Sequence, residues 1–383
     1  MNLKRLLPLL IVPLLLTACP SGANRTKNGP DLRNLPREIR SGEQGPFHVQ
    51  GIAVDLERGY IYFSFTTKLL KMDFEGNLIG SVDGMTGHLG CLTMNPADGR
   101  VYGSLEYKSD AVGRGILAHL GREDQLRDAF YAAIFDVDRI DHPSMDATAD
   151  GVMTTVYLRE VVEDYHAQVV CGGRTVDHRH GCSGIDGLTF GPFPGSSDGR
   201  DYLFVTYGVY SDLTRADNDY QVMLCYDTAD WRDYERPLSQ ASMHESGPAA
   251  PRNKLFVYTG NTTYGVQNLE YDAFTRCFWM AVYPGEKPEF PNHALFAVDG
   301  TAAPRRETLR GVEPPTEGEV LTLKGAKHPF DTPGFSYPLG STGLFAVGDG
   351  RYYLSEDGHC DKGWFTRLHL CRFDEATPFR DVL

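Results

Sequence analysis

The fold is decided by the stretch GIAVDLERGYIYFSF, residues 51–65, in which two apolar runs flank a short polar turn. Apolar and aromatic residues alternate with polar ones in both runs, which is typical of β-strands in a hairpin. The same succession returns along the chain in four clear copies, at 91–105, 187–207, 268–283 and 343–358. A weaker copy, MDATADGVMTTVYL, occupies 145–158. The chain therefore repeats one strand–turn–strand unit.

Additional strands ending in an acidic residue often follow these hairpins, so each repeat predicts a four-stranded antiparallel sheet. Such a sheet cannot bury both of its faces alone, and radial repetition solves that problem. We therefore predict an all-β protein with a β-propeller of six blades. Five blades are the alternative if 140–180 is an insertion, and a β-sandwich is the rival architecture. Only residues 111–129 read as helical, at a place where an insertion would lie.

Length and composition narrow the class of protein. The chain has 383 residues, 41% of them hydrophobic, which is enough for a large folded core. It carries 37 basic and 51 acidic residues, a formal net charge of −14, which disfavours nucleic acid and anionic lipid as partners. No phosphate-binding loop or dinucleotide fingerprint is present in a suitable context. The segment 195–199 matches G-x-S-x-G, but it lies in a hairpin turn rather than a nucleophile elbow.

The N-terminal segment MNLKRLLPLLIVPLLLTAC, residues 1–19, has a basic start, a short apolar run and a Cys after small residues. It resembles the lipobox of bacterial lipoprotein signal peptides, which implies lipidation of Cys19 and a location in the bacterial cell envelope. The alternative is an ordinary secretory signal. We predict a signal peptide over 1–18, a flexible tether over 19–45 and the propeller over 46–383, with the membrane contacted through the lipid only.

Over roughly residues 46–375 the repeat pattern resembles the six-bladed propellers of the SMP-30/gluconolactonase and NHL type. The resemblance implies a ligand site at the mouth of a central channel. In the SMP-30 family a first-blade Glu, with Asn and Asp, holds a metal ion. Here the first blade offers His48 and Gln50 instead. The resemblance to the SMP-30 family therefore does not by itself imply lactonase activity for this chain.

Propeller geometry brings together the residues before each first strand and after each second strand. His48 and His88 each stand four residues before the first core residue of a repeat, so they could share one divalent ion, Ca²⁺, Zn²⁺ or Mn²⁺, with Asp186 or Glu106. The alternative is that both imidazoles hydrogen-bond backbone between blades. Asp186 and Glu106 could also perform acid–base catalysis without a metal.

Further ligand-binding candidates follow from the same geometry. The loop 207–222 is rich in aromatic and charged residues, which suits a sugar, although a self-capped loop explains it equally well. Asp217, Asn218 and Asp219 in this loop could bind Ca²⁺ but lack the remaining ligands of an EF-hand. The candidate ligand-binding residues are Tyr207, Asp212, Arg215, Gln267, Asn268, Arg159 and Glu356.

Export would permit disulfides, and two pairs have a spacing that suits loop closure: Cys171 with Cys182, and Cys360 with Cys371. Nearby histidines make zinc the alternative at both places.

Two functions remain open from the sequence. One is a metal-assisted hydrolase of a small or carbohydrate-linked ester, lactone, amide or glycoside. The other is a non-catalytic propeller that binds a saccharide, peptide or protein.

Overall fold

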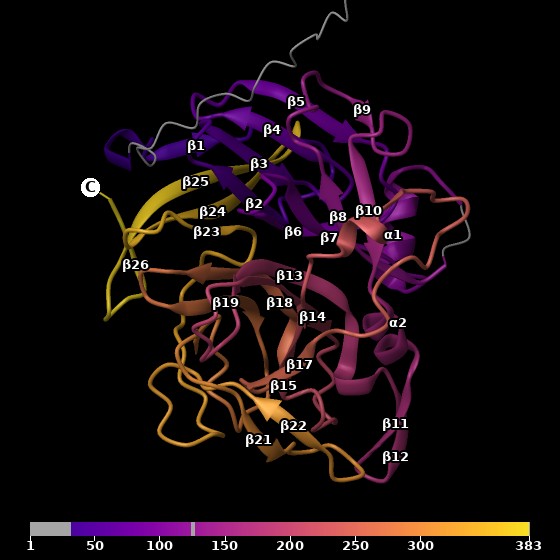
Figure 1. The fold of residues 1–383 in the computed structure, drawn as a ribbon, viewed down its shortest axis with the longest axis vertical. Coiled ribbons are helices and arrows are strands. Elements are labelled where there is room, and N and C mark those ends of the chain that lie inside the picture. Colours follow the sequence, from indigo (N-terminus) through magenta and orange to yellow (C-terminus); the bar gives the residue numbers. More distant parts are fainter. Residues whose placement is uncertain (1–31, 124–126, 383) are drawn as a thin grey trace, which may run out of the picture.

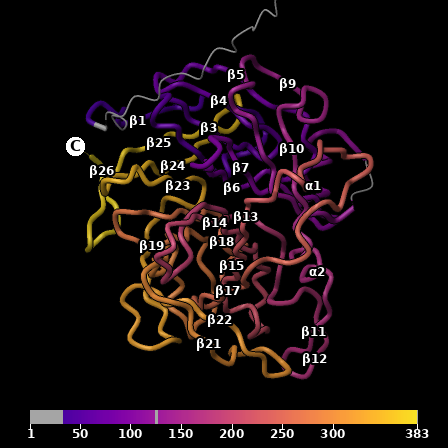
Figure 2. Tube along the Cα trace, viewed as in Figure 1, coloured from indigo at the N-terminus to yellow at the C-terminus, as the bar shows by residue number. Residues whose placement is uncertain are grey.

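A computed structural model describes residues 32–123 and 127–382 of the chain. These residues form five mainly antiparallel sheets arranged as the blades of a propeller. In Figure 1 the colours follow one another round the ring, and the yellow C-terminal strands lie beside the indigo N-terminal ones. The chain trace in Figure 2 shows the same circular order. The predicted all-β propeller is confirmed.

The strands of the blades follow one another along the chain. The first blade contains β2 (Gly51–Asp55), β3 (Tyr60–Ser64), β4 (Leu69–Asp73) and β5 (Leu78–Asp83). The second contains β6 (His88–Met94), β7 (Val101–Tyr107), β8 (Ala129–Phe135) and β10 (Met153–Tyr157). The third contains β13 (Cys182–Pro192), β14 (Asp201–Val209), β15 (Tyr220–Tyr226) and β17 (Asn253–Tyr258).

The fourth blade contains β18 (Thr262–Asp272), β19 (Cys277–Pro284) and β20 (Leu295–Asp299). The fifth contains β23 (Leu344–Ala346), β24 (Arg351–Cys360) and β25 (Gly363–Phe373), with β1 (Glu38–Arg40) and β26 (Phe379–Asp381) paired to β25. Shorter strands extend the edges or form a separate hairpin: β9 (Met145–Asp146), β11 (Gln168–Cys171), β12 (Arg174–Asp177), β16 (Arg236–Pro237), β21 (Arg305–Thr308) and β22 (Glu317–Val320).

Two short α-helices interrupt the repeats, α1 (Ala111–His119) and α2 (Arg159–His166). The first falls within the predicted helical insertion, and Asp110 caps it by accepting a hydrogen bond from the Gly113 amide at 3.0 Å. The second lies in the polar region 140–180 and was not predicted. Short 3₁₀ turns occur at Leu32–Asn34, Arg179–Gly181 and Trp231–Asp233. Within the described ranges, no helix has the length and apolar character needed to cross a membrane.

The hydrophobic core is divided into five clusters, one between each pair of neighbouring blades. Each cluster combines buried side chains from two adjacent sheets, represented by Tyr62 with Leu105, Tyr102 with Leu203, Phe204 with Leu269, Trp279 with Tyr352, and Ile52 with Tyr353. Both faces of each sheet are therefore covered, which explains why the strands carry apolar residues on both sides.

The preferred count of six blades is wrong, and the alternative of five is correct. The weak copy at 145–158 does not form a hairpin. Its second half is β10, which pairs antiparallel with β8 as the outer strand of the second blade. Its first half is the two-residue β9, which pairs parallel with β5 of the first blade. A strand with the right alternation was thus assigned to the wrong sheet, because strand pairing depends on tertiary contacts.

The folded body begins earlier than the predicted boundary at residue 46. Residues Glu38–Arg40 form β1, which pairs antiparallel with β25 and joins the first and last parts of the described residues in one blade. Ile39 is buried between exposed neighbours, as expected for a strand with one covered face. The predicted signal peptide 1–18 and Cys19 lie outside the described residues.

The predicted disulfides are not formed, and all seven cysteines of the described residues are free. Cys360 pairs with Gly363 beside the turn of the β24–β25 hairpin, whereas Cys371 pairs with Tyr352 at its far end. Eight residues of strand between Gly363 and Cys371 span roughly 26 Å, far beyond the reach of a disulfide. Cys171 lies near the tip of the β11–β12 hairpin, whereas Cys182 opens β13.

Candidate functional site

The candidate site is a cavity of about 360 Å³ at the mouth of the channel. Its walls come from the starts of the inner strands β6, β13 and β18, from the end of β7 and from α1. Many of the residues that the sequence placed at the mouth do line it: His48, Gln50, His88, Glu106, Asp186 and Gln267. These residues from separate blades thus line one cavity, and their roles in binding or catalysis stay predictions.

Irregularities in three inner strands position this site. The pairing register shifts between Leu89 and Leu92 in β6, between Ile185 and Leu188 in β13, and between Val266 and Asn268 in β18. Each shift inserts extra residues into the inner strand, which bends the strand and changes the direction of its side chains. Asp186 and Gln267 both lie within these insertions.

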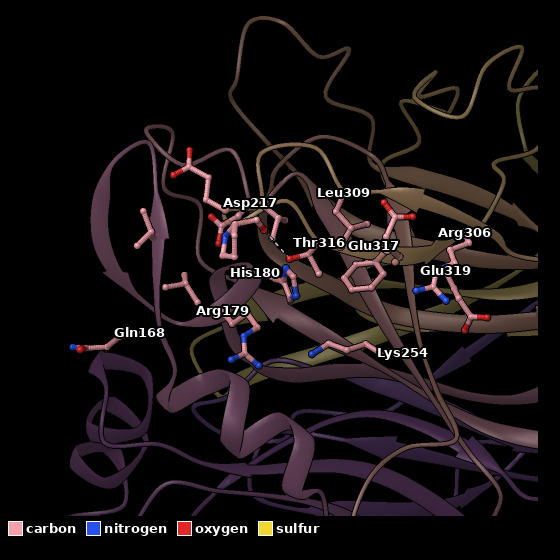
Figure 3. Close-up of a pocket in the computed structure, with 17 residues that line it drawn as sticks. Gln168, Arg179, His180, Asp217, Lys254, Arg306, Leu309, Thr316, Glu317 and Glu319 are labelled. Carbon is pink, nitrogen blue, oxygen red and sulfur yellow. Dashed lines mark hydrogen bonds between the residues drawn. The ribbon is translucent and has the colours of Figure 1, made fainter.

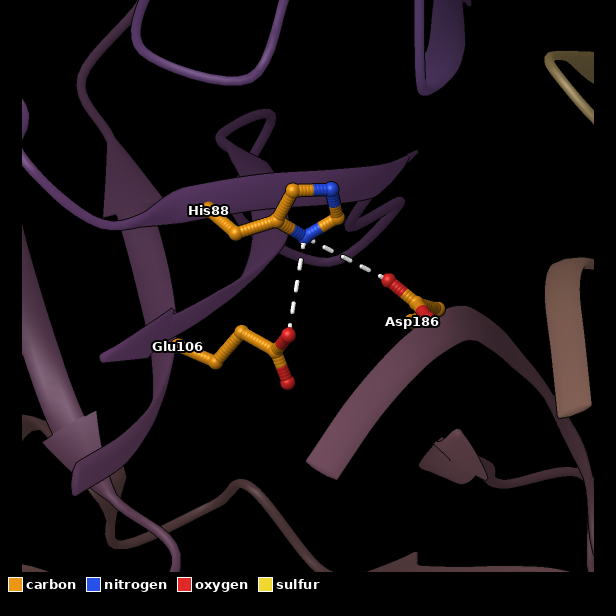
Figure 4. Close-up of side chains that lie close together, drawn as sticks. All are labelled: His88, Glu106 and Asp186. Atoms are coloured by element: carbon orange, nitrogen blue, oxygen red, sulfur yellow. Dashed lines mark ion pairs between the residues drawn. The ribbon is translucent and has the colours of Figure 1, made fainter. Parts of the chain in front are cut away.

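His88, Glu106 and Asp186 form a compact group in which one ligand atom from each lies within 4.8 Å of the others. His88 and Glu106 face each other across β6 and β7. The His88 Nδ1 atom is 3.7 Å from Glu106 Oε1 and 3.5 Å from Asp186 Oδ1. Figure 4 shows the imidazole pointing at both carboxylates. Neither His88 Nδ1 nor Asp186 Oδ1 has a hydrogen-bond partner among the described residues.

Lys108 adds a positive charge next to this group. Its Nζ lies 2.5 Å from Glu106 Oε1 and donates a hydrogen bond to the Ser183 carbonyl at 2.9 Å. The other Glu106 oxygen accepts from the Ile185 amide at 2.9 Å. Gly184 makes room for this carboxylate, because a Cβ at Gly184 would collide with Glu106 Oε2. Glu106 is therefore held firmly, whereas His88 and Asp186 keep unsatisfied atoms.

Burial controls the protonation of the group. Burial raises the pKa of Asp186 well above its ordinary value, and the neighbouring charge of Glu106 raises it further. Burial also raises the pKa of Glu106, against the opposing effect of Lys108. The pKa of His88 falls to about 3, mainly through burial and secondly through Lys108. His88 is thus a neutral imidazole at physiological pH, the form that can accept a proton or a metal ion.

The donor set of one nitrogen and two carboxylates suits a divalent cation such as Zn²⁺ or Mn²⁺. The two unsatisfied atoms of His88 and Asp186 favour this reading, since an ion between them would satisfy both. Lys108 weighs against it, because its ammonium group already neutralises Glu106. The three residues could therefore hold an ion. Glu106 would be the weakest ligand of the three, because Lys108 already pairs with it.

His48, the second predicted metal ligand, lines the same cavity but is not a member of the group. Its Nδ1 lies 2.7 Å from the Val49 carbonyl and 3.5 Å from Asp357 Oδ2. Its Nε2 lies 3.2 Å from the Gln50 amide. Asp186, 3.5 Å from His88, and Glu106, 3.7 Å from it, are the carboxylates beside His88 in the structure. The proposed sharing of one ion between His48 and His88 stays a prediction.

Gln267 and Asn268 have different roles although they are adjacent. The Gln267 amide donates to Asp186 Oδ2 at 3.2 Å and lines the cavity. The Asn268 amide is buried and donates to the carbonyls of Gln50 at 3.0 Å and Ser341 at 2.8 Å. Gln267 therefore belongs to the site, whereas Asn268 joins the backbones of neighbouring blades.

The polar side chains of the segment 207–222 bond to other groups of the protein. Tyr207 is fully buried and its hydroxyl donates to Asp164 at 2.8 Å. Arg215 is buried and makes a bidentate pair with Asp217, with both contacts at 2.8 Å. Asp212 accepts from the amide and hydroxyl of Thr214. These side chains border no part of the mouth cavity, so the predicted ligand contacts of this loop have no accessible surface there.

A lysine fills the place that the sequence suggested for calcium. The buried Lys287 ammonium donates to Asn218 Oδ1 at 3.0 Å, and also to Asp219 and the Arg215 carbonyl. One fixed positive charge thus satisfies the oxygens of this loop.

The last two predicted ligand residues also make contacts within the protein. Arg159 begins α2, and its guanidinium lies 3.8 Å from Glu245. Glu356 on β24 pairs with His369 at 2.9 Å and Arg367 at 3.2 Å. Neither lines the mouth cavity.

The sequence pattern does not indicate several of the residues that line the cavity: Phe47, Lys108, Val112, Ile116, Ser183, Tyr264 and Tyr283. Lys108 lies two residues beyond Glu106, so strand alternation could have placed both on one side. Val112 and Ile116 are four apart on α1, which is the spacing of one helix face. The position of Tyr264 in the cavity lining depends on a local backbone distortion that the sequence pattern does not reveal.

A larger hollow of about 780 Å³ lies away from the mouth, between the β11–β12 hairpin and the outer edge of the third blade (Figure 3). Its buried His180 has an Nδ1 atom without a partner among the described residues. Arg179 and Lys254 both pair with Asp164, and Lys254 also pairs with Glu160 at 2.9 Å. The charges of Arg179 and Lys254 are thus already balanced within the protein.

No family model matches the chain, and a search of the curated proteins finds no match. Solved structures similar to it include a GH43_1 enzyme from Xanthomonas citri complexed with xylose, with 11% identity over 88% of this chain and 91% of that chain, at a TM-score of 0.39. A gluconolactonase from Xanthomonas campestris has 10% identity over 86% and 88%, at a TM-score of 0.31. The Dos1 propeller has 11% identity over 84% and 78%, at a TM-score of 0.28.

Proposed function

We propose that the protein is a hydrolase that cleaves a small or carbohydrate-linked ester, lactone, amide or glycoside at the channel mouth. The supporting observation is the pair His88 Nδ1 and Asp186 Oδ1, 3.5 Å apart, both buried and without hydrogen-bond partners among the described residues. Leaving a buried polar atom unsatisfied costs about 1–3 kcal/mol. Two such atoms facing each other beside a cavity indicate a place where a proton, a cation or a substrate group completes the arrangement.

The residues of the group would divide the work. Asp186 borders the cavity and would transfer a proton to or from the substrate, while the Gln267 amide holds its second oxygen. His88 in its neutral form would accept a hydrogen bond from the protonated carboxyl group of Asp186, which holds that proton near the cavity. Lys108 pairs with Glu106 and stabilises its anionic form beside Asp186.

His88, Asp186 and Glu106 are the residues that would hold a divalent ion. Such an ion would polarise the scissile bond and make a bound water more acidic. Acid–base catalysis by the two carboxylates is the form of the proposal that needs no ion.

The test is a hydrolysis assay on chromogenic esters, amides and glycosides and on unsubstituted lactones, before and after addition of Ca²⁺, Zn²⁺ or Mn²⁺. We expect wild-type protein to cleave at least one class. Asp186→Asn should lower that rate by about 10²–10⁴-fold, the usual contribution of a positioned acid or base. Asp198→Asn, in an exposed turn between β13 and β14, is the matched control and should keep the wild-type rate.

Full activity of Asp186→Asn would remove Asp186 from the mechanism. An absence of hydrolysis across all classes, with and without metal, would favour the alternative of a non-catalytic propeller that binds a saccharide, peptide or protein.

We also propose a lipid anchor at Cys19 in the bacterial cell envelope, for which the lipobox pattern is the support. The mass of the mature N-terminal peptide tests it, because an unmodified Cys19 would contradict the proposal.

A further inference from the structure

Tyr264 has an unusual backbone for a bulky residue. Its φ is 67°, in the left-handed region, and the following Gly265 has a φ of 78°. For a residue with a side chain, this conformation costs about 1–2 kcal/mol. Both residues lie in β18, between Thr263 and Val266, where the pairing register with β19 shifts. Strain of this kind persists only where surrounding contacts enforce it, and it concentrates at functional positions.

The distortion turns an aromatic ring outward over the cavity. The side chain of Tyr264 is 56% exposed, although it lines the same cavity as Asp186. One edge contacts Tyr283, with ring centroids 6.2 Å apart and planes at 85°. A T-shaped contact of this kind orients the ring while leaving much of its surface open.

The backbone of Tyr264 is connected directly to the reactive group. The Gln267 amide donates to the Tyr264 carbonyl at 3.1 Å and to Asp186 Oδ2 at 3.2 Å. A Cβ at Gly265 would meet the Tyr207 carbonyl at 2.5 Å, so glycine is required beside Tyr264. The same short segment thus positions the open ring and the Asp186 carboxylate.

We propose that Tyr264 is the platform on which a sugar ring of the substrate stacks, which places that ring over Asp186. The inference rests on the proposed function and names its substrate class as a saccharide. A pyranose or furanose ring has a face of C–H groups that packs against an aromatic ring, and an edge of hydroxyl groups that needs polar partners. The cavity supplies such partners in Gln50, Thr66, Ser183 and Gln267.

The size of the cavity agrees with this substrate class. A volume of about 360 Å³ lies in the range of sites for small molecules, roughly 300–1,000 Å³. The apolar residues Phe47, Val112 and Ile116 line the same cavity. A site with both apolar and hydrogen-bonding walls fits an amphipathic ring better than an aliphatic chain or a compact ion.

The test measures binding by isothermal titration calorimetry with free glucose, galactose, xylose and mannose. These probes contain no glycosidic link, so turnover does not disturb the measurement. We expect at least one to bind wild-type protein. Tyr264→Phe should bind it within about threefold of wild type, because the ring remains. Tyr264→Asn should bind about tenfold more weakly, the loss of about one aromatic contact.

Asparagine tolerates the left-handed backbone, so Tyr264→Asn should keep the wild-type melting temperature or exceed it. A loss of sugar binding in this variant would then result from the missing aromatic ring and not from unfolding. Phe274→Asn is the matched control, since Phe274 is an equally exposed aromatic residue, 56%, outside the cavity lining. It should bind the sugar as wild type does.

The inference is overturned if no sugar binds, or if Tyr264→Asn binds as tightly as wild type. Hydrolysis of a sugar-free ester without sugar binding would overturn the inference and leave the proposed function standing. Sugar binding that depends on Tyr264, without hydrolysis of any tested bond, would support the inference and remove the proposed function.

Discussion

At the scale of single residues, the interior of the propeller holds acidic side chains whose protonation depends on their neighbours. Glu270 on β18 is buried, and its Oε1 accepts from the Ala346 amide at 2.9 Å. Its Oε2 is 3.4 Å from the Thr189 hydroxyl. Burial, with a smaller contribution from the nearby charge of Asp272, raises the pKa of Glu270 to about 8. No cationic side chain contributes to this shift, in contrast to the Glu106–Lys108 pair.

Because the folded state holds the Glu270 proton more tightly than the unfolded state, the stability linked to Glu270 is fully present below the unfolded pKa. It is lost as pH rises from about 4.5 to about 8. Over that interval the slope from one such group approaches 1.4 kcal/mol per pH unit. We expect Glu270→Gln to make the pH dependence of the unfolding free energy shallower by up to this amount.

The measurement is chemical denaturation at several pH values between 5 and 8. Asp141→Asn is the control, because Asp141 is exposed and should leave the slope nearly unchanged. Equal slopes for wild type and Glu270→Gln would show that Glu270 is ionised in the folded protein throughout the interval.

At the scale of elements, the closing strand β1 connects the start of the described residues to their C-terminal strands. It pairs with β25 over only three residues, Glu38–Arg40. Backbone hydrogen bonds continue the contact on both sides, from the Leu370 amide to the Arg37 carbonyl at 2.9 Å and from the Ser41 amide to the Thr366 carbonyl at 3.1 Å. Ile39 is 2% exposed and joins the cluster between the first and fifth blades.

We expect Ile39→Ala to lower the unfolding free energy by about 2–5 kcal/mol, since a buried aliphatic side chain is lost and a cavity remains. The neighbouring Glu38→Ala should cost under about 1 kcal/mol, because Glu38 is exposed and its partner Arg40 is a surface residue. Thermal and denaturant unfolding of the full chain measure both variants. Similar small effects from both would mean that β1 does not close the ring in solution.

The sequence pattern predicts the positions of strands well, but it predicts less well which strands pair with each other. Both halves of the repeat at 51–65 are strands, and they pair with each other. The strand at 153–157 was also recognised, but its partner is β8 and not the segment before it. Local alternation indicates a strand, whereas the choice of partner depends on chain segments that are far apart in sequence.

At the scale of the whole molecule, stability comes from apolar contacts between blades and from closure of the ring. Each of the five core clusters combines two blades. Cross-links are not needed for this arrangement, and the cysteines of the described residues act as small buried groups or, at Cys360, as a half-buried one.

We therefore expect the melting temperature to be the same, within about 1 °C, with and without a thiol reductant. A native disulfide typically contributes about 2–4 kcal/mol, so its reduction would lower the melting temperature by several degrees. Thiol titration of the denatured, unreduced protein is the second measurement, and it should detect the seven cysteines of the described residues. A reductant-sensitive transition would restore the disulfides predicted from the sequence.

The sequence by itself determined the all-β propeller and the strand positions, because alternating apolar residues and turn residues act locally. It also placed His88, Glu106, Asp186 and Gln267 near one mouth, because equivalent positions in a repeat share one location. The tertiary structure decided the number of blades, the distance between cysteines and the role of Lys108. It also decided the orientation of Tyr264, which follows from a register shift in β18. These features depend on which strands pair and in what register, and that choice is made by packing between distant segments.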